Sequence, residues 1–274
     1  EGEFVRWLQQ NEKNYPAFHV DGVKEFGTLA SIGSPNESRK QFTTRPFNIL
    51  TIENGFLVKR GINQQGLALA EYESNWYEFV TEKGFSYIPA INEYSPLRME
   101  LVDGKDLCSY TAAYTKKKRI IEQIVSCLEQ LHDLGSTSAD YFDIYEMYYA
   151  KTMKRLDSVR HLLPFSNERE IMINGRLCRN IFFYRDDLRK IINKYRCRQF
   201  TVIHGDPTFS NLLWKNDDTP VLIDPRGYFG RSTVYGDPLY DWAKLYYSIS
   251  GNYDQFNRGF FNLSINLSDV DLAI

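Results

Sequence analysis

The sequence predicts an α+β fold of two lobes: a small antiparallel β-sheet lobe with one helix, followed by a larger, mainly helical lobe. Three observations lead to this expectation. Two β-favouring runs flank an Asn-Gly pair within residues 47–59, which is a strong hairpin signal. Residues 67–83 gather apolar side chains on one helical face. Beyond Val102 the character changes, and residues 116–134 repeat the helical spacing.

The first lobe is expected over residues 1–102, with Val102-Asp103-Gly104 as the hinge to a second lobe over residues 103–274. Besides the helix, its elements are short apolar runs that end in turn residues. We predict strands over residues 26–32, 47–52, 56–59, 87–94 and 97–102, and a loop over residues 33–38.

The second lobe is expected to contain helices over residues 116–134, 143–163 and 185–196. Two short apolar runs, ending at Ile203 and Ile223, are predicted to be strands that deliver polar residues into loops.

The amino-acid composition limits the binding partners and the cellular compartment that we expect for this protein. The chain has 274 residues and a formal net charge of −2, whereas a nucleic-acid partner requires a basic face, so we expect no nucleic acid. Its four cysteines and four histidines form no zinc or disulfide pattern, which favours the reducing cytoplasm. No segment approaches the ~18 apolar residues of a membrane span, and no signal peptide is visible.

The most informative stretch is His204-Gly205-Asp206, followed by Asn211 and then, after a second apolar run, by Asp224. A lone acid after a strand is usually a cap or turn residue, but this joint pattern suits phosphoryl transfer. One carboxylate, Asp206, would orient an acceptor hydroxyl and accept its proton. One amide and one carboxylate, Asn211 and Asp224, would hold Mg²⁺ against the phosphates of ATP. We interpret His204 as a brace of the loop, because Asp206 already supplies the base.

The pattern His-Gly-Asp-x-x-x-x-Asn followed by Ile-Asp resembles the catalytic and metal-binding segments of the aminoglycoside phosphotransferase and choline kinase family. The matching positions are Asp206, Asn211 and Asp224. The resemblance implies a protein-kinase-like fold, ATP and Mg²⁺ as cofactors, and a small hydroxyl-bearing acceptor. It also implies a nucleotide-binding first lobe and a second lobe that holds the catalytic loop and the acceptor site.

The run from Asp224 to Gly230, together with residues 235–237 and 240–245, is similar to a branch found in capsule and surface-polysaccharide gene clusters. That similarity implies a sugar or polyol acceptor. A choline, ethanolamine or aminoglycoside kinase is an open alternative, as is a kinase-like nucleotide-binding module without catalysis. The oligomeric state is open.

Two charged residues of the first lobe are candidates to bind the nucleotide. Lys59 ends a strand, at the position of the nucleotide-binding lysine in kinase-like folds. Its glutamate partner is sought on the following helix. Glu73 is preferred to Glu71 and Glu78, because Trp76 and Tyr77 follow it at the spacing of a face that packs on the sheet. The alternative interpretation is that both are ordinary solvated charges.

Three further positions are nucleotide-binding candidates by location alone. Ser34, in the loop over residues 33–38, could donate a hydrogen bond to a phosphate, although an ordinary turn is equally consistent. Glu100 and Leu101 lie just before the hinge, where backbone groups would contact adenine.

Several polar residues are expected to support the loops rather than react. Arg226 could stabilise the transferring phosphoryl group, but we prefer the interpretation that it ties the loop to a carboxylate. Asp241 is interpreted as fixing the catalytic loop, and Asp237 as a helix cap. Acidic residues across 140–200 could suit a cationic amine, although a charged helix face is the commoner explanation. These acidic residues are Asp140, Asp143, Glu146, Asp157, Glu168 and Glu170.

Overall fold

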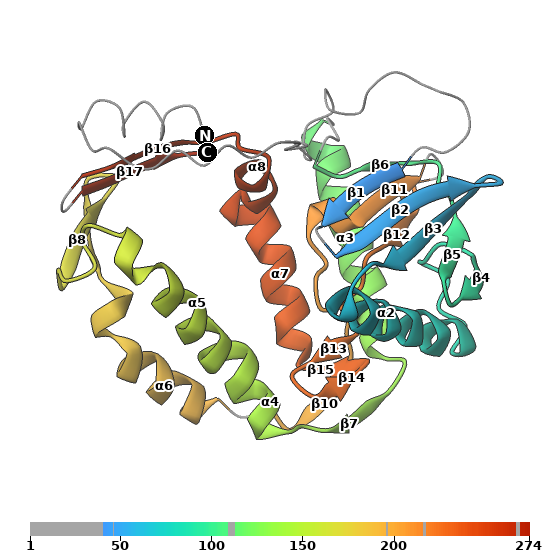
Figure 1. Ribbon diagram of the computed structural model, residues 1–274, viewed down its shortest axis with the longest axis horizontal. Helices are drawn as coiled ribbons and strands as arrows, with labels where there is room; N and C mark the ends of the chain where they lie inside the picture. Colours follow the sequence, from blue (N-terminus) through green and yellow to red (C-terminus); the bar gives the residue numbers. More distant parts are fainter. Residues whose placement is uncertain (1–40, 46, 109–112, 196, 216–217, 267–268) are drawn as a thin grey trace. The chain divides into compact units, whose positions relative to one another are not determined.

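The computed structural model describes residues 41–45, 47–108, 113–195, 197–215, 218–266 and 269–274. The predicted strand at 26–32 and the predicted loop at 33–38, with Ser34, lie outside the described residues. The described chain has an α+β fold with a sheet-based lobe and a second lobe of helices and short strands, as predicted (Figure 1).

In the described residues, the first lobe contains a five-stranded antiparallel sheet in the order β1-β2-β3-β5-β4. The hairpin at Asn54-Gly55 is confirmed, since both residues have positive φ, 52° and 80°, as a tight two-residue turn requires. The strands are β1 (Gln41–Arg45), β2 (Asn48–Glu53), β3 (Phe56–Gly61), β4 (Ile91–Tyr94) and β5 (Leu97–Glu100).

The predicted strand over residues 87–94 is wrong in its first half, and that over 97–102 is two residues too long. The carbonyl of Tyr87 accepts a hydrogen bond from the amide of Leu222 at 2.8 Å, so it pairs with the second lobe instead of the sheet. Hydrogen bonding across the lobes therefore shortens a run that looks like continuous strand.

Helix α2 (Gln64–Glu82) covers the sheet and begins three residues before its predicted start. The side chain of Asn63 accepts a hydrogen bond from the Gly66 amide at 2.8 Å and caps the helix. Its buried side chains recur at helical spacing, as a single face against the sheet requires. They are Glu73, Ser74, Trp76, Tyr77 and Val80.

The second lobe contains the remaining helices. The predicted helix over 143–163 is interrupted by a π-helical turn at Glu146–Ala150, and the helix predicted at 185–196 ends at Lys194. The segments are α3 (Tyr114–His132), α4 (Tyr141–Tyr145), η2 (Glu146–Ala150), α5 (Lys151–Val159), η3 (Arg160–Leu162), η4 (Ile181–Phe183), α6 (Arg185–Lys194), η5 (Phe209–Asn211), α7 (Pro238–Gly251) and α8 (Tyr253–Asn257).

Short strands between these helices form four small sheets. One joins β12 (Pro220–Leu222), β11 (Leu212–Lys215) and β6 (Gly104–Asp106), and a second joins β15 (Tyr235–Gly236), β10 (Gln199–Val202) and β7 (Ser136–Ser138). The others pair β13 (Tyr228–Phe229) with β14 (Ser232–Thr233), and β16 (Asn262–Ile265) with β17 (Asp269–Ala273), β8 (Glu170–Ile173) and β9 (Arg176–Arg179). The lobe boundary stays a prediction, although residues 101–103 belong to no helix or strand and β6 pairs with β11.

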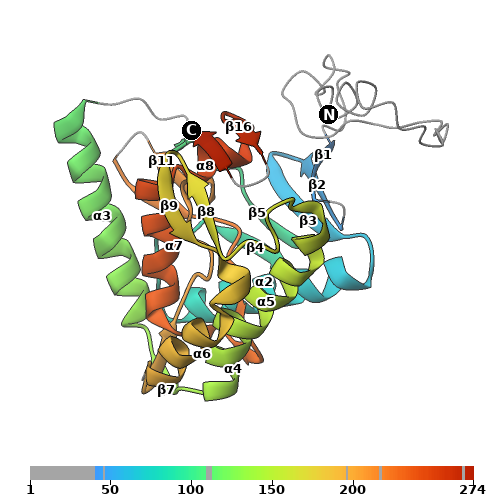
Figure 2. The ribbon, with the colours of Figure 1, turned by 90° about the vertical axis from the view of Figure 1, so that its left-hand side faces the viewer.

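Two clusters of buried apolar side chains meet along β10. Val202 belongs to the cluster that includes Trp76 and Leu128, whereas Ile203 belongs to the cluster that includes Phe229. Figure 2 shows α3 running beside α7, where the rings of His132 and Trp242 meet edge to face at 5.3 Å. The loop after β10 therefore begins at the point where the two buried clusters meet.

Candidate active site

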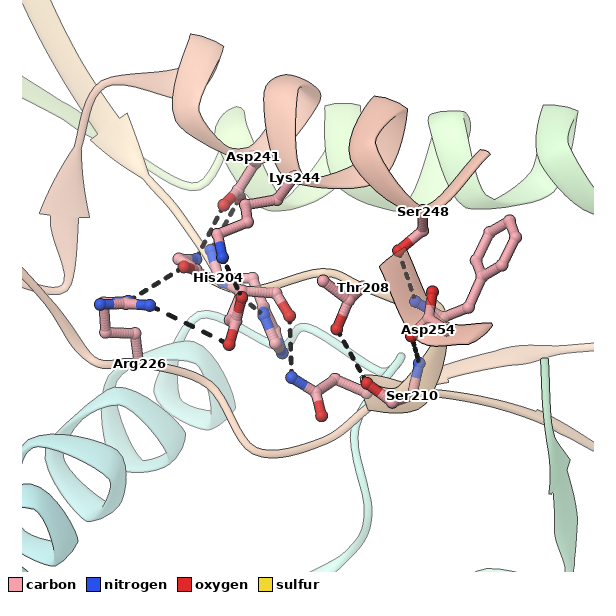
Figure 3. A network of polar contacts seen from close by, with 12 residues as sticks. His204, Thr208, Ser210, Arg226, Asp241, Lys244, Ser248 and Asp254 are labelled. Atoms are coloured by element: carbon pink, nitrogen blue, oxygen red, sulfur yellow. Dashed lines mark hydrogen bonds and ion pairs between the residues drawn. The ribbon is translucent and has the colours of Figure 1, made fainter. Parts of the chain in front are cut away.

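The loop after β10 is held by a fully buried carboxylate on α7. Oδ2 of Asp241 accepts a hydrogen bond from the His204 amide at 2.8 Å, and Oδ1 accepts one from the Gly205 amide at 2.7 Å. Figure 3 shows Asp241 above this loop, and Nε2 of His132 lies 3.1 Å from the same carboxylate. Asp241 therefore fixes this loop, as predicted, and Asp237 caps α7 through the Leu239 amide at 3.0 Å.

His204 braces the loop from inside. Its ring is fully buried, and burial lowers the pKa of the imidazole, which favours the neutral form. Nδ1 accepts a hydrogen bond from the Asp206 amide at 3.2 Å, so Nε2 carries the proton and donates to the Ile223 carbonyl at 3.0 Å. This tautomer connects the two loops that hold the candidate acids, which confirms the structural role expected for His204.

The carboxylate of Asp206 projects from this braced loop and is 18% exposed. Nζ of Lys244 lies 2.9 Å from its Oδ1, and Arg226 reaches within 4.0 Å of its Oδ2. Nε of Arg226 also donates to the Gly205 carbonyl at 3.1 Å, so its hydrogen bond to the loop goes to a backbone carbonyl, whereas the sequence predicted a carboxylate (Figure 3). Asp206 is thus held in place with two cationic neighbours.

Strand pairing brings Asn211 and Asp224 to the same end of one sheet. Leu212 of β11 pairs with Leu222 of β12, and the Ile223 amide donates to the Asn211 carbonyl at 3.0 Å. Nδ2 of Asn211 donates to the carbonyl of Asp206 at 2.9 Å, which turns the amide oxygen away from that bond. The structure therefore joins the loops of all three residues by hydrogen bonds.

Asp224 also contacts the first lobe. The ammonium group of Lys59 donates to Oδ1 of Asp224 and lies 2.6 Å from Oε2 of Glu73. Burial opposes the charge of Lys59, but the two carboxylates outweigh it and raise the pKa of the ammonium group above its ordinary value. Glu71 and Glu78 are exposed, so the structure joins Lys59 to the glutamate that the spacing of Trp76 and Tyr77 favoured.

Glu100 and Leu101 lie at the end of β5. The amide of Glu100 already donates to the Ala90 carbonyl at 2.8 Å, so it is engaged within the sheet, while Leu101 is exposed. Their role in binding adenine stays a prediction.

The donor set near Asp224 fits Mg²⁺ only if phosphate and water complete the shell. Within the described ranges, no group of three or more His, Cys, Asp or Glu side chains could hold a metal ion alone. Mg²⁺ is usually bound through one or two carboxylates plus substrate phosphates and water. One carboxylate that is 34% exposed, Asp224, and one amide oxygen, Asn211, match that demand.

Sequence reasoning missed the basic residues around Asp206. Lys244 follows Asp241 by one helical turn, so the two share a face of α7, and this i, i+3 spacing could have revealed the contact. Lys151 and Arg155, which line a cavity together with Lys244, carry no comparable signal, because they lie on a different helix, α5.

The fold and this arrangement define a kinase-like phosphotransferase. Residues 55–264 match the model of the family described as "Phosphotransferase enzyme family", and the chain belongs to that family. The protein is accordingly a phosphotransferase. None of the curated proteins matches the chain.

A solved structure with a TM-score above 0.5 agrees at the level of the fold. The chain is similar to a macrolide 2'-phosphotransferase type I, with 12% identity and a TM-score of 0.51 over 82% of this chain and 75% of that one. It also matches the choline kinase LicA from Streptococcus pneumoniae, with 14% identity and a TM-score of 0.45 over 85% and 77% of the two chains. A choline/ethanolamine kinase family protein from Mesorhizobium loti matches with 14% identity and a TM-score of 0.44, over 84% and 70%.

No helix of the described chain has the length and apolar character needed to cross a membrane.

Proposed function

We propose that this protein transfers the γ-phosphoryl group of ATP, with Mg²⁺, to a hydroxyl group of a small molecule in the cytoplasm. The observation that carries the proposal is the chain of contacts from Glu73 through Lys59 to Asp224, beside the loop that holds Asp206 and Asn211. The acceptor is proposed to be a sugar or polyol of surface-polysaccharide biosynthesis. Its support is the similarity of residues 224–245 to that branch.

Each residue has a separate role in the proposed reaction. Glu73 holds Lys59 in place, and Lys59 neutralises charge on the ATP phosphates. Asn211 and Asp224 would hold Mg²⁺, which supplies charge neutralisation at the phosphates. Asp206 orients the acceptor hydroxyl for in-line attack and takes its proton.

One bond forms and one breaks in the transfer. The acceptor oxygen forms a bond to the γ-phosphorus as the bond from that phosphorus to ADP breaks, and the hydroxyl proton passes to Asp206. Positioning and charge neutralisation supply most of the rate.

Asp206→Asn tests the proposal. The variant keeps the shape of the side chain but has no basic carboxylate, so turnover should fall by about 10³-fold while ATP still binds. ATP consumption over a set of hydroxyl acceptors, with mass detection of the product, measures the first effect. The rise in melting temperature with ATP and Mg²⁺ measures the second.

Asp224→Asn is the companion variant, and the exposed Asp187→Asn is the matched control. Asp224→Asn should lose both turnover and the Mg²⁺-dependent part of the ATP-induced stabilisation, whereas Asp187→Asn should retain both. Wild-type turnover in Asp206→Asn would remove that residue from the mechanism. Absence of any ATP-induced stabilisation in the unmutated protein would contradict the proposed function as a whole.

A further inference from the structure

A cavity of about 450 Å³ lies between the η2–α5 segment and α7, on the side of Asp206. Lys244 connects the cavity with Asp206, because it lines the cavity and its Nζ lies 2.9 Å from the Asp206 carboxylate. The volume is typical of small-molecule sites, which range from about 300 to 1,000 Å³. A hydroxyl group that reaches Asp206 therefore has room behind it for the rest of a sugar-sized molecule.

The charged lining of this cavity is entirely basic. Among the described residues, Lys151, Arg155 and Lys244 line it, and no Asp or Glu does. Within the part of the chain that the structure describes, neither Lys151 nor Arg155 forms an ion pair. Burial, followed by the charges of Arg226, Arg155 and Lys244, lowers the pKa of Lys151 to about 8. These cations repel one another; Lys244 is paired with Asp206, whereas Lys151 and Arg155 have no ion-pair partner in the described ranges.

Three acidic residues of the same region, Asp140, Asp143 and Asp157, are engaged elsewhere. Asp140 caps α4 through the Phe142 amide at 2.8 Å, and Asp157 pairs with Arg185. Asp143 accepts hydrogen bonds from the amides of Arg231 and Ser232, at 2.9 and 3.1 Å, and so holds the loop after β13. None of the three lines the cavity, so they offer no site for a cationic amine there.

We infer that the acceptor is an anionic hydroxyl compound, such as a phosphorylated sugar or polyol or a sugar acid, whose negative group binds Lys151 and Arg155 in this cavity. The inference rests on the proposed function and narrows its substrate class. Charge-assisted hydrogen bonds to phosphate or carboxylate are the strong ones, and two cations in one cavity suit either anion. A choline or aminoglycoside acceptor would bring positive charge toward three cations, which disfavours those alternatives. The aromatic lining, which includes Tyr148 and Tyr240, provides walls for the uncharged body of the molecule.

A direct binding experiment tests the anion site without knowledge of the acceptor. Inorganic phosphate and glucose 1-phosphate are titrated into the protein by calorimetry, with glucose as the uncharged partner of the second probe. We expect both anions to bind, and glucose to bind at least about tenfold more weakly than glucose 1-phosphate. Lys151→Met and Arg155→Met should each weaken anion binding by roughly 10- to 100-fold, the size expected for one charge-assisted hydrogen bond.

Lys154→Met is the matched control, because Lys154 is exposed on the same helix and does not line the cavity. It should bind the anions as the unmutated protein does. Equal loss in Lys154→Met and Lys151→Met, or anion binding unchanged in Lys151→Met and Arg155→Met, would overturn the inference.

Turnover separates this inference from the proposed function. With glucose 1-phosphate against glucose, and glycerol 3-phosphate against glycerol, the anionic member of each pair should have the higher kcat/KM. Lys151→Met should raise the acceptor KM and leave the ATP KM unchanged. Preferred turnover of choline or kanamycin would overturn the anionic acceptor but support the kinase activity. Absence of ATP-induced stabilisation would instead contradict the proposed function.

Discussion

The ammonium nitrogen of Lys59 lies 2.6 Å from Oε2 of Glu73, and both side chains are almost fully buried. The pair joins β3 to α2, so it fixes the helix against the sheet at the point where Asp224 approaches from the second lobe. Burying two charges is costly unless each has a partner. The burial of the Lys59–Glu73 pair is therefore consistent with a site in which the ammonium group of Lys59 must stay in one position.

Glu73→Gln should lower the affinity for ATP and the rate of transfer. The amide no longer neutralises Lys59, which then turns fully toward Asp224 and becomes less available to the phosphates. We expect kcat/KM for ATP to fall by roughly 10- to 100-fold, measured by steady-state kinetics with varied ATP. Glu71→Gln, two residues earlier on the exposed face, should behave as the unmutated protein does. Equal kinetics for the two variants would contradict the role of Glu73.

Asp241→Asn should destabilise the protein and slow turnover together. The two oxygens of this carboxylate accept hydrogen bonds from the amides of His204 and Gly205. In Asn the NH₂ group replaces one of these oxygens, so one backbone N–H would face another donor and lose its hydrogen bond. We expect a loss of about 1–3 kcal/mol in unfolding free energy, measured by urea unfolding with an unchanged m-value. The exposed Asp187→Asn serves as the control. Full stability of Asp241→Asn with normal turnover would show that the loop does not need this anchor.

The sequence could predict the elements whose information is local. Asn54-Gly55 permits the positive φ angles of a tight turn, and the spacing of Glu73 to Trp76 and Tyr77 places the acid on the buried face of α2. The polar loop after β10 and the acid after β12 were also visible, because each follows a short apolar run.

The rest depends on contacts between distant segments. Strands such as β13 and β14 are two residues long and exist only because they pair with each other, so no periodicity marks them. The basic cavity needs α5 and α7, which lie about ninety residues apart in the chain, and a lysine on a helix looks like any solvated charge until its neighbours are known. The start of β4 was missed for the same reason, since Tyr87 bonds to Leu222.

Gly227→Ala, a substitution in the second lobe, should displace helix α2 of the first lobe. A Cβ atom at Gly227 would lie 2.2 Å from the Tyr72 carbonyl oxygen in α2, and φ at this glycine is 72°. The alanine must therefore push α2 away, together with the neighbouring Glu73. We expect reduced stability, by an amount on the order of 1–3 kcal/mol, and a weaker ATP-induced rise in melting temperature.

Gly84→Ala provides the control for backbone strain. Gly84 has a similar φ of 75°, but a Cβ atom there would meet no heavy atom within 4 Å from the residues that the structure describes. It should lose some stability from φ alone and keep its response to ATP. If both variants respond to ATP as the unmutated protein does, the contact between Gly227 and Tyr72 does not position the lysine–glutamate pair.

Lys151→Met should stabilise the protein at neutral pH while it weakens acceptor binding. Burial and neighbouring cations lower the pKa of Lys151 to about 8 from an ordinary value of 10.5, so the native state disfavours its charge. Between these two pH values the unfolded chain binds more protons than the native one, and the stability of the unmutated protein rises with pH. The unmutated protein is therefore less stable than Lys151→Met by the full amount below pH 8, and this difference in stability disappears as the pH approaches 10.5.

Melting temperatures of the two proteins at pH 7 and at pH 10 check this sign. We expect Lys151→Met to melt a few degrees higher at pH 7, by roughly 1–4 °C, and the difference to shrink at pH 10. Lys154→Met, which removes an exposed charge from the same helix, should show no such pH-dependent gain. A stabilisation of Lys151→Met that is lost when phosphate is added would link the effect to an anion in the cavity, because a bound anion favours the charged lysine. A lower melting temperature for Lys151→Met at pH 7 without phosphate would mean that the charge of Lys151 is already compensated in the native protein.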